Sequence, residues 1–341
     1  MKAAFVTQYG GPEVLEIRET PVPVPAPKDL LVRVRAIGLN FADIFGRFGV
    51  YPGTPKPPFI PGLEFSGTVE AVGPDVLHFR PGERVMGYCR LGSHAEYVLV
   101  NENYATIVPD AMSYEEGASF LATGLSAYHG IVRLATLSPG EKILIHAAAG
   151  GVGLASVQIA RDLGAEVFAT AGSEEKVSFA RSYGAHHVIN YMQYDFAEEV
   201  LRLSGKYGVD VVMDSVGGEV FKKSWQLLAQ MGRYVLFGVS AVTGKGPLSR
   251  LKAASVYTMM RPIFPPSLMG ANKGIFGFNL GTLTGKEKYF REAGIELLRF
   301  YRRGVLKPVI GRIFPFEEIV EAHRFLQTRQ SVGKVVVRVG A

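Results

Sequence analysis

The sequence predicts an α/β protein in which an all-β region is followed by a doubly wound parallel sheet. Residues 1–110 contain short strand-like runs separated by Gly and Pro turns. From residue 142 onward, strand-like and helix-like segments alternate, which is typical of a parallel sheet covered by helices. The chain has 341 residues, which is long enough for two domains.

The first 110 residues favour a small barrel, because short and evenly spaced strands are typical of one. A single helix is expected over residues 113–134, where Ser113 and Glu116 have the spacing of a capping box. We expect this helix to link the all-β region to the parallel sheet. The expected strands of the all-β region are 3–7, 15–19, 30–39, 64–72, 84–87, 95–100 and 104–107.

A glycine turn lies between the first strand and the first helix of the parallel-sheet region. It contains Ala148-x-Gly150-x-x-Gly153, the dinucleotide fingerprint with alanine in place of the first glycine. Glycines let the backbone turn tightly and approach a pyrophosphate, and the helix N-terminus offers N–H groups to phosphate oxygens. We therefore predict a dinucleotide site formed by Ala148, Gly150, Gly151, Val152 and Gly153.

The end of the next strand indicates which nicotinamide cofactor fits. An Asp or Glu at this position holds the ribose hydroxyls and repels a 2′-phosphate, but here the residue is Ala171. Gly172, Ser173, Lys176 and Tyr191 follow, and their hydroxyl, ammonium and phenol groups could converge on a phosphate. We therefore predict NADPH rather than NADH.

A structural interpretation of the same residues stays open. Ser173 also suits a helix N-cap, and Lys176 then becomes an ordinary helix residue in solvent. Glu174 and Glu175 count against a phosphate at this position.

The rest of the parallel-sheet region continues the alternation. Two turns that begin at Asp214 and Phe237 follow strand ends and are candidates to border the cofactor, because ligands bind at the carboxyl ends of such strands. Residues 243–283 are predicted to be irregular, as a mobile arm, a subunit contact or a long connection. The expected strands are 143–146, 166–170, 187–189, 210–214, 234–237, 309–315 and 334–339, and the expected helices are 152–164, 174–183, 196–203, 220–228, 287–303 and 316–327.

Composition narrows the functional class. The formal net charge is +6, but Lys and Arg are scattered among acidic residues, which favours a phosphate-bearing cofactor over nucleic acid. The single Cys89 excludes an intrachain disulfide and a Cys-rich metal site. No apolar run is long enough to span a bilayer and no signal peptide is evident, so we expect a cytoplasmic protein without a transmembrane segment. His146 is expected to be a buried, hydrogen-bonded histidine.

Three motifs carry a resemblance to a known family. They are GLNFAD at 38–43, FIPGLE at 59–64 and HAAAGGVG at 146–153. With them the whole chain resembles a zinc-free medium-chain dehydrogenase/reductase of the quinone oxidoreductase group, which is zeta-crystallin-like. Residues 272–281 and 332–335 are most similar to the VAT-1-like reductases of that group.

The resemblance implies a two-domain enzyme. A GroES-like β-barrel catalytic domain is expected at 1–124 and 262–341, with a Rossmann NADPH-binding domain at 125–261. The cofactor is expected in the cleft, and a homodimer is common in the family.

The resemblance also bears on metal binding. Zinc alcohol dehydrogenases of the same superfamily have Cys where Asn40 stands and His where Leu63 stands. Because neither residue can replace a thiolate or an imidazole on Zn²⁺, we predict no metal site. Without a Lewis acid a saturated ketone is a poor substrate, so we expect a quinone or an α,β-unsaturated carbonyl.

The resemblance assigns roles to individual residues. Asn40 and Asp43 are expected beside the nicotinamide, and Tyr51 is expected to donate a hydrogen bond or a proton to the substrate oxygen. Asp43 also suits a helix cap, and Tyr51 also suits a packed loop aromatic. Further cofactor contacts are expected from Thr123, Phe237, Gly238, Phe278, Leu280 and Lys334, of which Phe278 also suits the core.

Two other functions stay open. One is a cofactor-binding protein with a structural, RNA-binding or membrane-associated role; the sequence has no basic run interleaved with aromatic residues to favour RNA. The other is reduction of a long-chain or acyl-thioester enone, which depends on the pocket near Tyr51 and residues 259–269.

Overall fold

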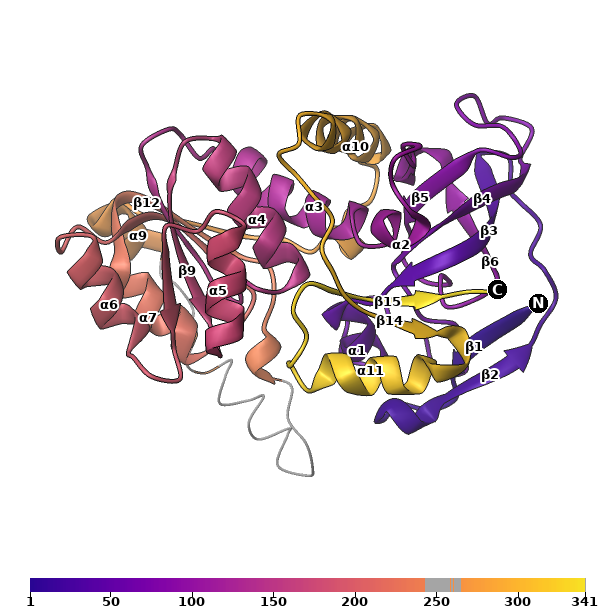
Figure 1. Cartoon of the computed structure of the whole chain (residues 1–341), viewed down its shortest axis with the longest axis horizontal. Helices are drawn as coiled ribbons and strands as arrows, with labels where there is room; N and C mark the ends of the chain where they lie inside the picture. The colour runs from indigo at the N-terminus through magenta and orange to yellow at the C-terminus, as the bar shows by residue number, and fades with distance from the viewer. Residues whose placement is uncertain (243–257, 259, 261–264, 341) are drawn as a thin grey trace. The chain divides into compact units, whose positions relative to one another are not determined.

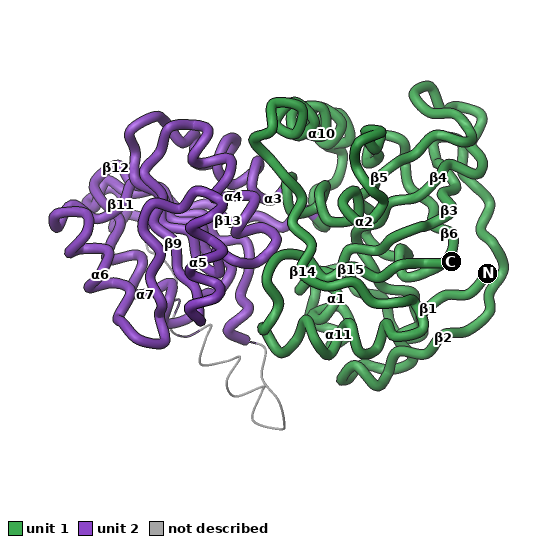
Figure 2. The backbone as a smooth tube through the Cα atoms, in the orientation of Figure 1, with its two compact units in different colours: residues 1–125, 281–341 green, residues 126–280 purple. Residues whose placement is uncertain are grey.

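A computed structural model describes residues 1–242, 258, 260 and 265–340. These residues form two compact units, shown in different colours in Figure 2. Unit 1 contains Met1–Leu125 and Gly281–Ala341, and unit 2 contains Ser126–Leu280.

Unit 1 is built around one strand, β3 (Asp29–Gly38), which pairs with three others. Alternate residues such as Leu30, Val32 and Val34 are buried, as the alternation of a strand requires. The sheet order is β14-β15-β3-β4-β5-β7, with β6 also on β3. Its other strands are β4 (Glu64–Val72), β5 (Arg84–Tyr88), β6 (Tyr97–Asn101), β7 (Ala105–Ile107), β14 (Ile310–Pro315) and β15 (Lys334–Arg338), and a separate pair is β1 (Lys2–Val6) with β2 (Leu15–Glu19).

The C-terminal segment completes the sheet of unit 1. β15 pairs with β3, and β14 pairs with β15, so the two ends of the chain share one sheet. Helix α11 (Ile319–Gln327) packs on β14 and β15, as Figure 1 shows in yellow. Helix α10 (Glu287–Arg302) contacts β7.

Helix α1 (Phe41–Arg47) was not predicted, because the first 110 residues were expected to be all β. The backbone N–H of Asn40 donates to Oδ2 of Asp43 at 2.7 Å, which stabilises the first turn. The usual capping box has Ser or Thr followed by Glu or Gln, so the Asn-to-Asp spacing is a weaker sequence signal.

The single helix expected over 113–134 was wrong. The chain forms α2 (Tyr114–Gly117), α3 (Leu121–Tyr128) and a π-helical turn (His129–Leu134), although the predicted capping box of Ser113 and Glu116 is confirmed. The break has a physical reason, because the N–H of Ala122 donates to the carboxylate of Glu64 from β4 rather than to a preceding turn.

Unit 2 has the predicted parallel sheet, with the order β10-β9-β8-β11-β12-β13. After β8 the chain adds β9 and β10 on one side, and from β11 it adds β12 and β13 on the other side. The strand order therefore reverses between β8 and β11, and such a switch point is where ligands generally bind to parallel sheets. The strands are β8 (Lys142–Ile145), β9 (Glu166–Ala171), β10 (His187–Asn190), β11 (Val209–Asp214), β12 (Leu228–Leu236) and β13 (Gly274–Gly277). The helices are α4 (Gly151–Asp162), α5 (Glu174–Ser182), α6 (Phe196–Leu203), α7 (Glu219–Leu227) and α9 (Pro265–Ala271).

The stretch predicted to be irregular, 243–283, contains regular elements. Residues 265–271 form α9, and β13 pairs with β12 at the edge of the sheet. The predicted domain limit at 261/262 therefore lies before two elements that the structure groups with unit 2, because β13 extends the parallel sheet. Met259 lies outside the described residues.

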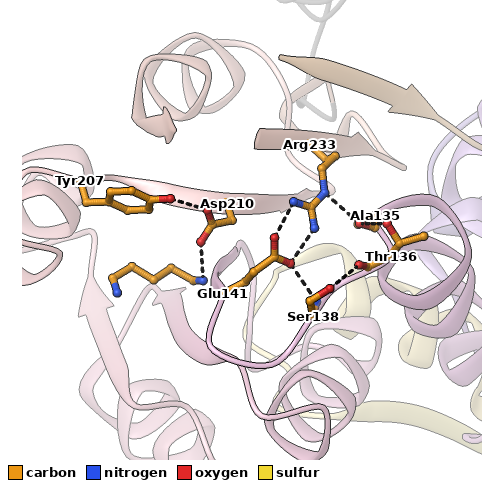
Figure 3. Close-up of polar contacts among 8 residues, drawn as sticks. Ala135, Thr136, Ser138, Glu141, Tyr207, Asp210 and Arg233 are labelled. Atoms are coloured by element: carbon orange, nitrogen blue, oxygen red, sulfur yellow. Dashed lines mark hydrogen bonds and ion pairs between the residues drawn. The ribbon is translucent and has the colours of Figure 1, made fainter. Parts of the chain in front are cut away.

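A network of polar groups lies at the N-terminal end of β8 (Figure 3). Arg233 donates two hydrogen bonds of 2.7 Å to Glu141 and one to the carbonyl of Ala135. Asp210 accepts from the phenol of Tyr207 and from the N–H of Lys142. The network lies at the end of β8 opposite the glycine turn.

Among the described residues, no helix is long and apolar enough to cross a membrane.

Two histidines in unit 1 are fully buried and in edge-to-face contact. The ring centroids of His94 and His323 are 5.2 Å apart, and neither ring has a hydrogen-bond partner among the described residues. Burial lowers the pKa of His94 to about 3. Burial, together with His94 and the Arg47 guanidinium, lowers the pKa of His323 well below its usual value. Both rings are therefore neutral in the folded chain.

The histidine pair predicts loss of stability in acid. The unfolded chain takes up protons below about pH 6.5 and the folded pair does not, so the free energy of unfolding falls as the pH falls toward 3. His323→Leu is expected to reduce the loss between pH 7 and pH 5 by about 2 kcal/mol, measured by urea unfolding. Val320→Ala, in the same helix, serves as the control and should lower stability equally at both pH values. An unchanged pH dependence in His323→Leu would contradict the assignment.

Candidate active site

The carboxyl end of β3 lies between two strands that each bring a charged residue to it. The register pairs Ile37 with Phe65 of β4 and Gly38 with Val336 of β15. Continuing these registers places Glu64 opposite Gly38 and Lys334 opposite Asn40. Strand pairing alone therefore brings an acid, a base and an amide together.

These side chains form a buried ion pair with an amide attached. The ammonium of Lys334 is 2.7 Å from Oε2 of Glu64 and donates to Oδ1 of Asn40 at 2.5 Å. The side chains of Lys334 and Glu64 are only 4% and 0% exposed. Oε1 of Glu64 accepts the N–H of Ala122 at 2.7 Å. Burial raises the pKa of Glu64, and the Lys334 ammonium and the Ala122 N–H oppose this effect.

Gly38 is required for this arrangement. A Cβ atom there would lie 1.8 Å from the carbonyl oxygen of Ala118 and 2.8 Å from Oε2 of Glu64. Since real Cβ atoms do not approach so closely, any side chain at this position would displace the Glu64 carboxylate or the α2 backbone.

Asp43 lies beside the ion pair, at the first turn of α1. It is 3% exposed, and its Oδ1 atom accepts no hydrogen bond from the described residues. Burial raises its pKa to about 7, against the opposing effects of the Asn40 N–H and Lys334. Asp43 therefore exchanges a proton near neutral pH. Its capping contact, one of the two predicted interpretations, is present.

The other predicted residues of unit 1 lie nearby in different settings. Tyr51 is half-buried in the turn after α1, and its carbonyl accepts from Thr54. The hydroxyl of Thr123 donates back to the carbonyl of Ser119 at 2.9 Å. Burial raises the pKa of Cys89, so its thiol is inert at neutral pH.

The glycine turn of unit 2 has the form that the fingerprint predicts. α4 begins at Gly151 with Gly150 as its N-cap, and no side chain caps it. A Cβ at Gly153 would lie 2.4 Å from the carbonyl oxygen of Ala147, so the helix packs directly on the turn. Ala148 is fully buried at the position of the missing glycine. The first N–H groups of α4 are thus left for a ligand that fits a bare backbone.

The residues predicted for the 2′-phosphate lie together at the ends of the neighbouring strands β9 and β10. The hydroxyl of Ser173 accepts the N–H of Lys176 at 3.3 Å, so the predicted N-cap is present. Lys176 is half-buried and burial lowers its pKa, so it is not a fully solvated helix residue. A Cβ at Gly172 would lie 2.5 Å from the phenol oxygen of Tyr191, which places that phenol over a bare backbone.

The two other predicted turns border the switch point of the sheet. Asp214, fully buried, accepts hydrogen bonds from the N–H groups of Val216 and Gly217 and from the phenol of Tyr234. His146 is buried and hydrogen-bonded to Thr170 and Ser224, as predicted.

Four predicted residues follow β12 and β13. Phe278 stacks on Phe237 with centroids 5.7 Å apart, so part of its surface packs against protein, as in the alternative interpretation. A Cβ at Gly238 would lie 2.9 Å from the carbonyl oxygen of Ser215, and Leu280 is buried.

Sequence reasoning missed Glu64 as a member of the site. It ends the FIPGLE motif, but a single acidic residue at a strand start carries no signal by itself. The available signal was its place opposite Gly38, which requires the strand register.

Within the part of the chain that the structure describes, no three His, Cys, Asp or Glu residues are grouped so as to hold a metal ion. Oδ1 of Asn40 instead accepts from the Lys334 ammonium.

The comparisons with known proteins identify the family. The family "Zinc-binding dehydrogenase" matches residues 151–296, and "Alcohol dehydrogenase GroES-like domain" matches residues 26–110. The synaptic vesicle membrane protein VAT-1 homolog of Rattus norvegicus is 36% identical over 341 residues, covering 99% of this chain and 84% of that protein. The quinone oxidoreductase of Homo sapiens is 31% identical, covering 99% and 97%.

A solved structure agrees. Escherichia coli quinone oxidoreductase complexed with NADPH has a TM-score of 0.87 and 31% identity, and the match covers 99% of this chain and 100% of that chain. The chain therefore belongs to the medium-chain dehydrogenase/reductase family of oxidoreductases, in the group of quinone oxidoreductases and VAT-1 homologues. The predicted resemblance, with its GroES-like and Rossmann folds, is confirmed.

The glycine turn predicts unequal effects of two alanine substitutions. Gly153→Ala is expected to cost about 1–3 kcal/mol of stability, because the methyl group must displace the Ala147 carbonyl. Gly150→Ala is the matched control, because its methyl group would meet only that oxygen, at 3.3 Å. Thermal unfolding of both variants checks this, and equal losses would contradict the close packing of α4 on the turn.

Proposed function

We propose that this protein is an NADPH-dependent oxidoreductase that transfers hydride to a quinone or an α,β-unsaturated carbonyl without zinc. The observation that carries the proposal is the cluster of Asn40 with the buried residues Asp43, Glu64 and Lys334. The proposal is supported by the buried Lys334 ammonium and by the raised pKa of Asp43, which lie beside the position where a zinc enzyme has a cysteine ligand. Hydrogen bonding and proton transfer can then support reduction of an acceptor that is already electrophilic.

The residues of unit 2 fit the phosphates of NADPH. The start of α4, from Gly150 to Gly153, suits the pyrophosphate. Its N-cap is a glycine, so no N-cap side chain occupies the first backbone N–H groups of the helix. Ser173, Lys176 and Tyr191, beside Gly172, suit the 2′-phosphate, since Ala171 adds no negative charge at the strand end. Ala148, Gly151 and Val152 complete the turn, and Phe237, Gly238, Phe278 and Leu280 are proposed as further contacts.

NADPH, when bound, supplies the hydride. Asn40 positions the ligands, and the phenol of Tyr51 donates a hydrogen bond to the substrate oxygen. Asp43, protonated below about pH 7, supplies the proton that accompanies the hydride and regains one from water. Thr123 is proposed as a further contact to NADPH.

We further propose that unit 1 serves catalysis and unit 2 serves NADPH binding, with the limits of the two compact units replacing the predicted limits at 124/125 and 261/262. A cytoplasmic homodimer is proposed from the family, and the buried, unpaired Cys89 is compatible with a reducing compartment.

The first test is substrate and cofactor preference. We expect NADPH oxidation with quinones or enones, none with saturated ketones, and activity that persists after dialysis against a chelator. Lys176→Ala should raise the KM for NADPH about tenfold and leave that for NADH unchanged, because a charged contact to the 2′-phosphate is lost. NADPH binding without turnover of any substrate would overturn the proposal in favour of a cofactor-binding protein.

The second test is the role of Asp43. Because its donor form is lost as the pH rises through about 7, kcat/KM should fall above that pH. Asp43→Asn should lower kcat about 100-fold and remove this pH dependence. It retains an oxygen that can accept the Asn40 N–H, so the start of α1 is preserved. A variant whose activity still falls above pH 7 would assign the titration to another group.

A further inference from the structure

We propose that Glu64 and Lys334 are positioning residues that lock the side-chain amide of Asn40, so that its oxygen serves as a hydrogen-bond acceptor toward a ligand N–H or O–H group. The inference deepens the proposed function and rests on the role given there to Asn40. It assigns a function to Glu64 and gives Lys334 a role other than direct cofactor contact.

The polarity of the Asn40 amide follows from its neighbours. The Lys334 ammonium has only donors, so the Asn40 atom 2.5 Å away is the oxygen. The Asn40 nitrogen donates to the carbonyl of Gly38 at 3.0 Å. The amide oxygen of Asn40 therefore faces a donor and its nitrogen faces an acceptor, which allows only one orientation of the amide group.

The oxygen keeps capacity for a ligand. A carbonyl oxygen has two lone pairs, and Lys334 uses one. Asn40 is partly exposed, whereas Lys334 and Glu64 are not. The group that meets a ligand is thus Asn40, and it meets the ligand as an acceptor polarised by a buried cation. A nicotinamide carboxamide N–H or a sugar hydroxyl has the matching chemistry.

Glu64 holds Lys334 in place. Without it, a buried ammonium would lack a counter-charge and would draw water or the Asp43 carboxylate toward itself. Its second oxygen is held by the Ala122 N–H, so the carboxylate is fixed at both ends. The backbone before Lys334 also packs closely on β14, because a Cβ at Gly311 would lie 1.7 Å from the Val332 carbonyl oxygen. The Ala122 N–H therefore holds Glu64, Glu64 holds Lys334, and Lys334 holds the Asn40 amide.

A double-mutant cycle tests the coupling. Lys334→Met is expected to lower kcat/KM about 10- to 100-fold when Asn40 is present, because a mispositioned catalytic group costs up to this factor. In an Asn40→Ala background the same substitution should change kcat/KM less than twofold. An equal loss in both backgrounds would overturn the proposal, because a purely structural role does not depend on the Asn40 amide.

A second readout does not need turnover. In protein labelled with ¹⁵N-asparagine, the Asn40 side-chain amide is assigned by its absence in Asn40→Ala. Lys334→Met should shift this resonance and speed its exchange with water. An unchanged resonance would overturn the inference even if activity falls. If the wild-type protein reduces no quinone or enone, the proposed function fails, while this measurement still decides the positioning role.

Variants are chosen so that folding does not obscure the result. Glu64→Gln with Lys334→Met removes both charges and leaves neither uncompensated, and it replaces the single variant if that one does not fold. The matched control is Glu141→Gln with Arg233→Met, which removes the ion pair of Figure 3 in unit 2. The control should leave the Asn40 resonance unchanged, and a shift there as large as that of Lys334→Met would overturn the assignment.

Discussion

Burial of the Glu64–Lys334 pair is the constraint on which the organisation of unit 1 depends. Two charges withdrawn from water require compensation by each other and by hydrogen bonds. Here the compensation comes from the Asn40 amide and from the Ala122 N–H, at the starts of α1 and α3. The break between α2 and α3 and the absence of a side chain at Gly38 both follow from the need to bring these groups together.

Unit 2 has a different constraint, because a ligand must be able to reach the backbone N–H groups at the start of α4. The glycine turn keeps the first N–H groups of α4 free of a side-chain cap, and Gly153 lets the helix pack on the turn. The reversal of strand order between β8 and β11 leaves this turn and the Asp214 turn at neighbouring strand ends. Local chemistry and topology thus agree on one place for an anionic ligand.

Burial has opposite effects on the charge of different groups. It removes charge from the His94 and His323 pair, which has no counter-ion among the described residues, and the cost is sensitivity to acid. It raises the pKa of the Asp43 carboxyl group to about 7. Burial also raises the pKa of Glu64, but there the Lys334 ammonium, 2.7 Å away, opposes the effect. The two buried carboxyl groups therefore differ in that Glu64 has a fixed cation at hydrogen-bond distance.

The sequence by itself determined the fold class, most strands and helices, and the glycine turn, because hydrophobic periodicity and glycine spacing are local signals. It also indicated Asn40 and Asp43 through a family motif. Helix α1, the divided helix after Ser113 and strand β13 were not predicted, since each depends on contacts with distant residues. Only the tertiary structure decided that Glu64 and Lys334, 270 positions apart in the sequence, flank the end of β3. The physical reason is that strand register, set by the packing of a whole sheet, determines which buried charges meet.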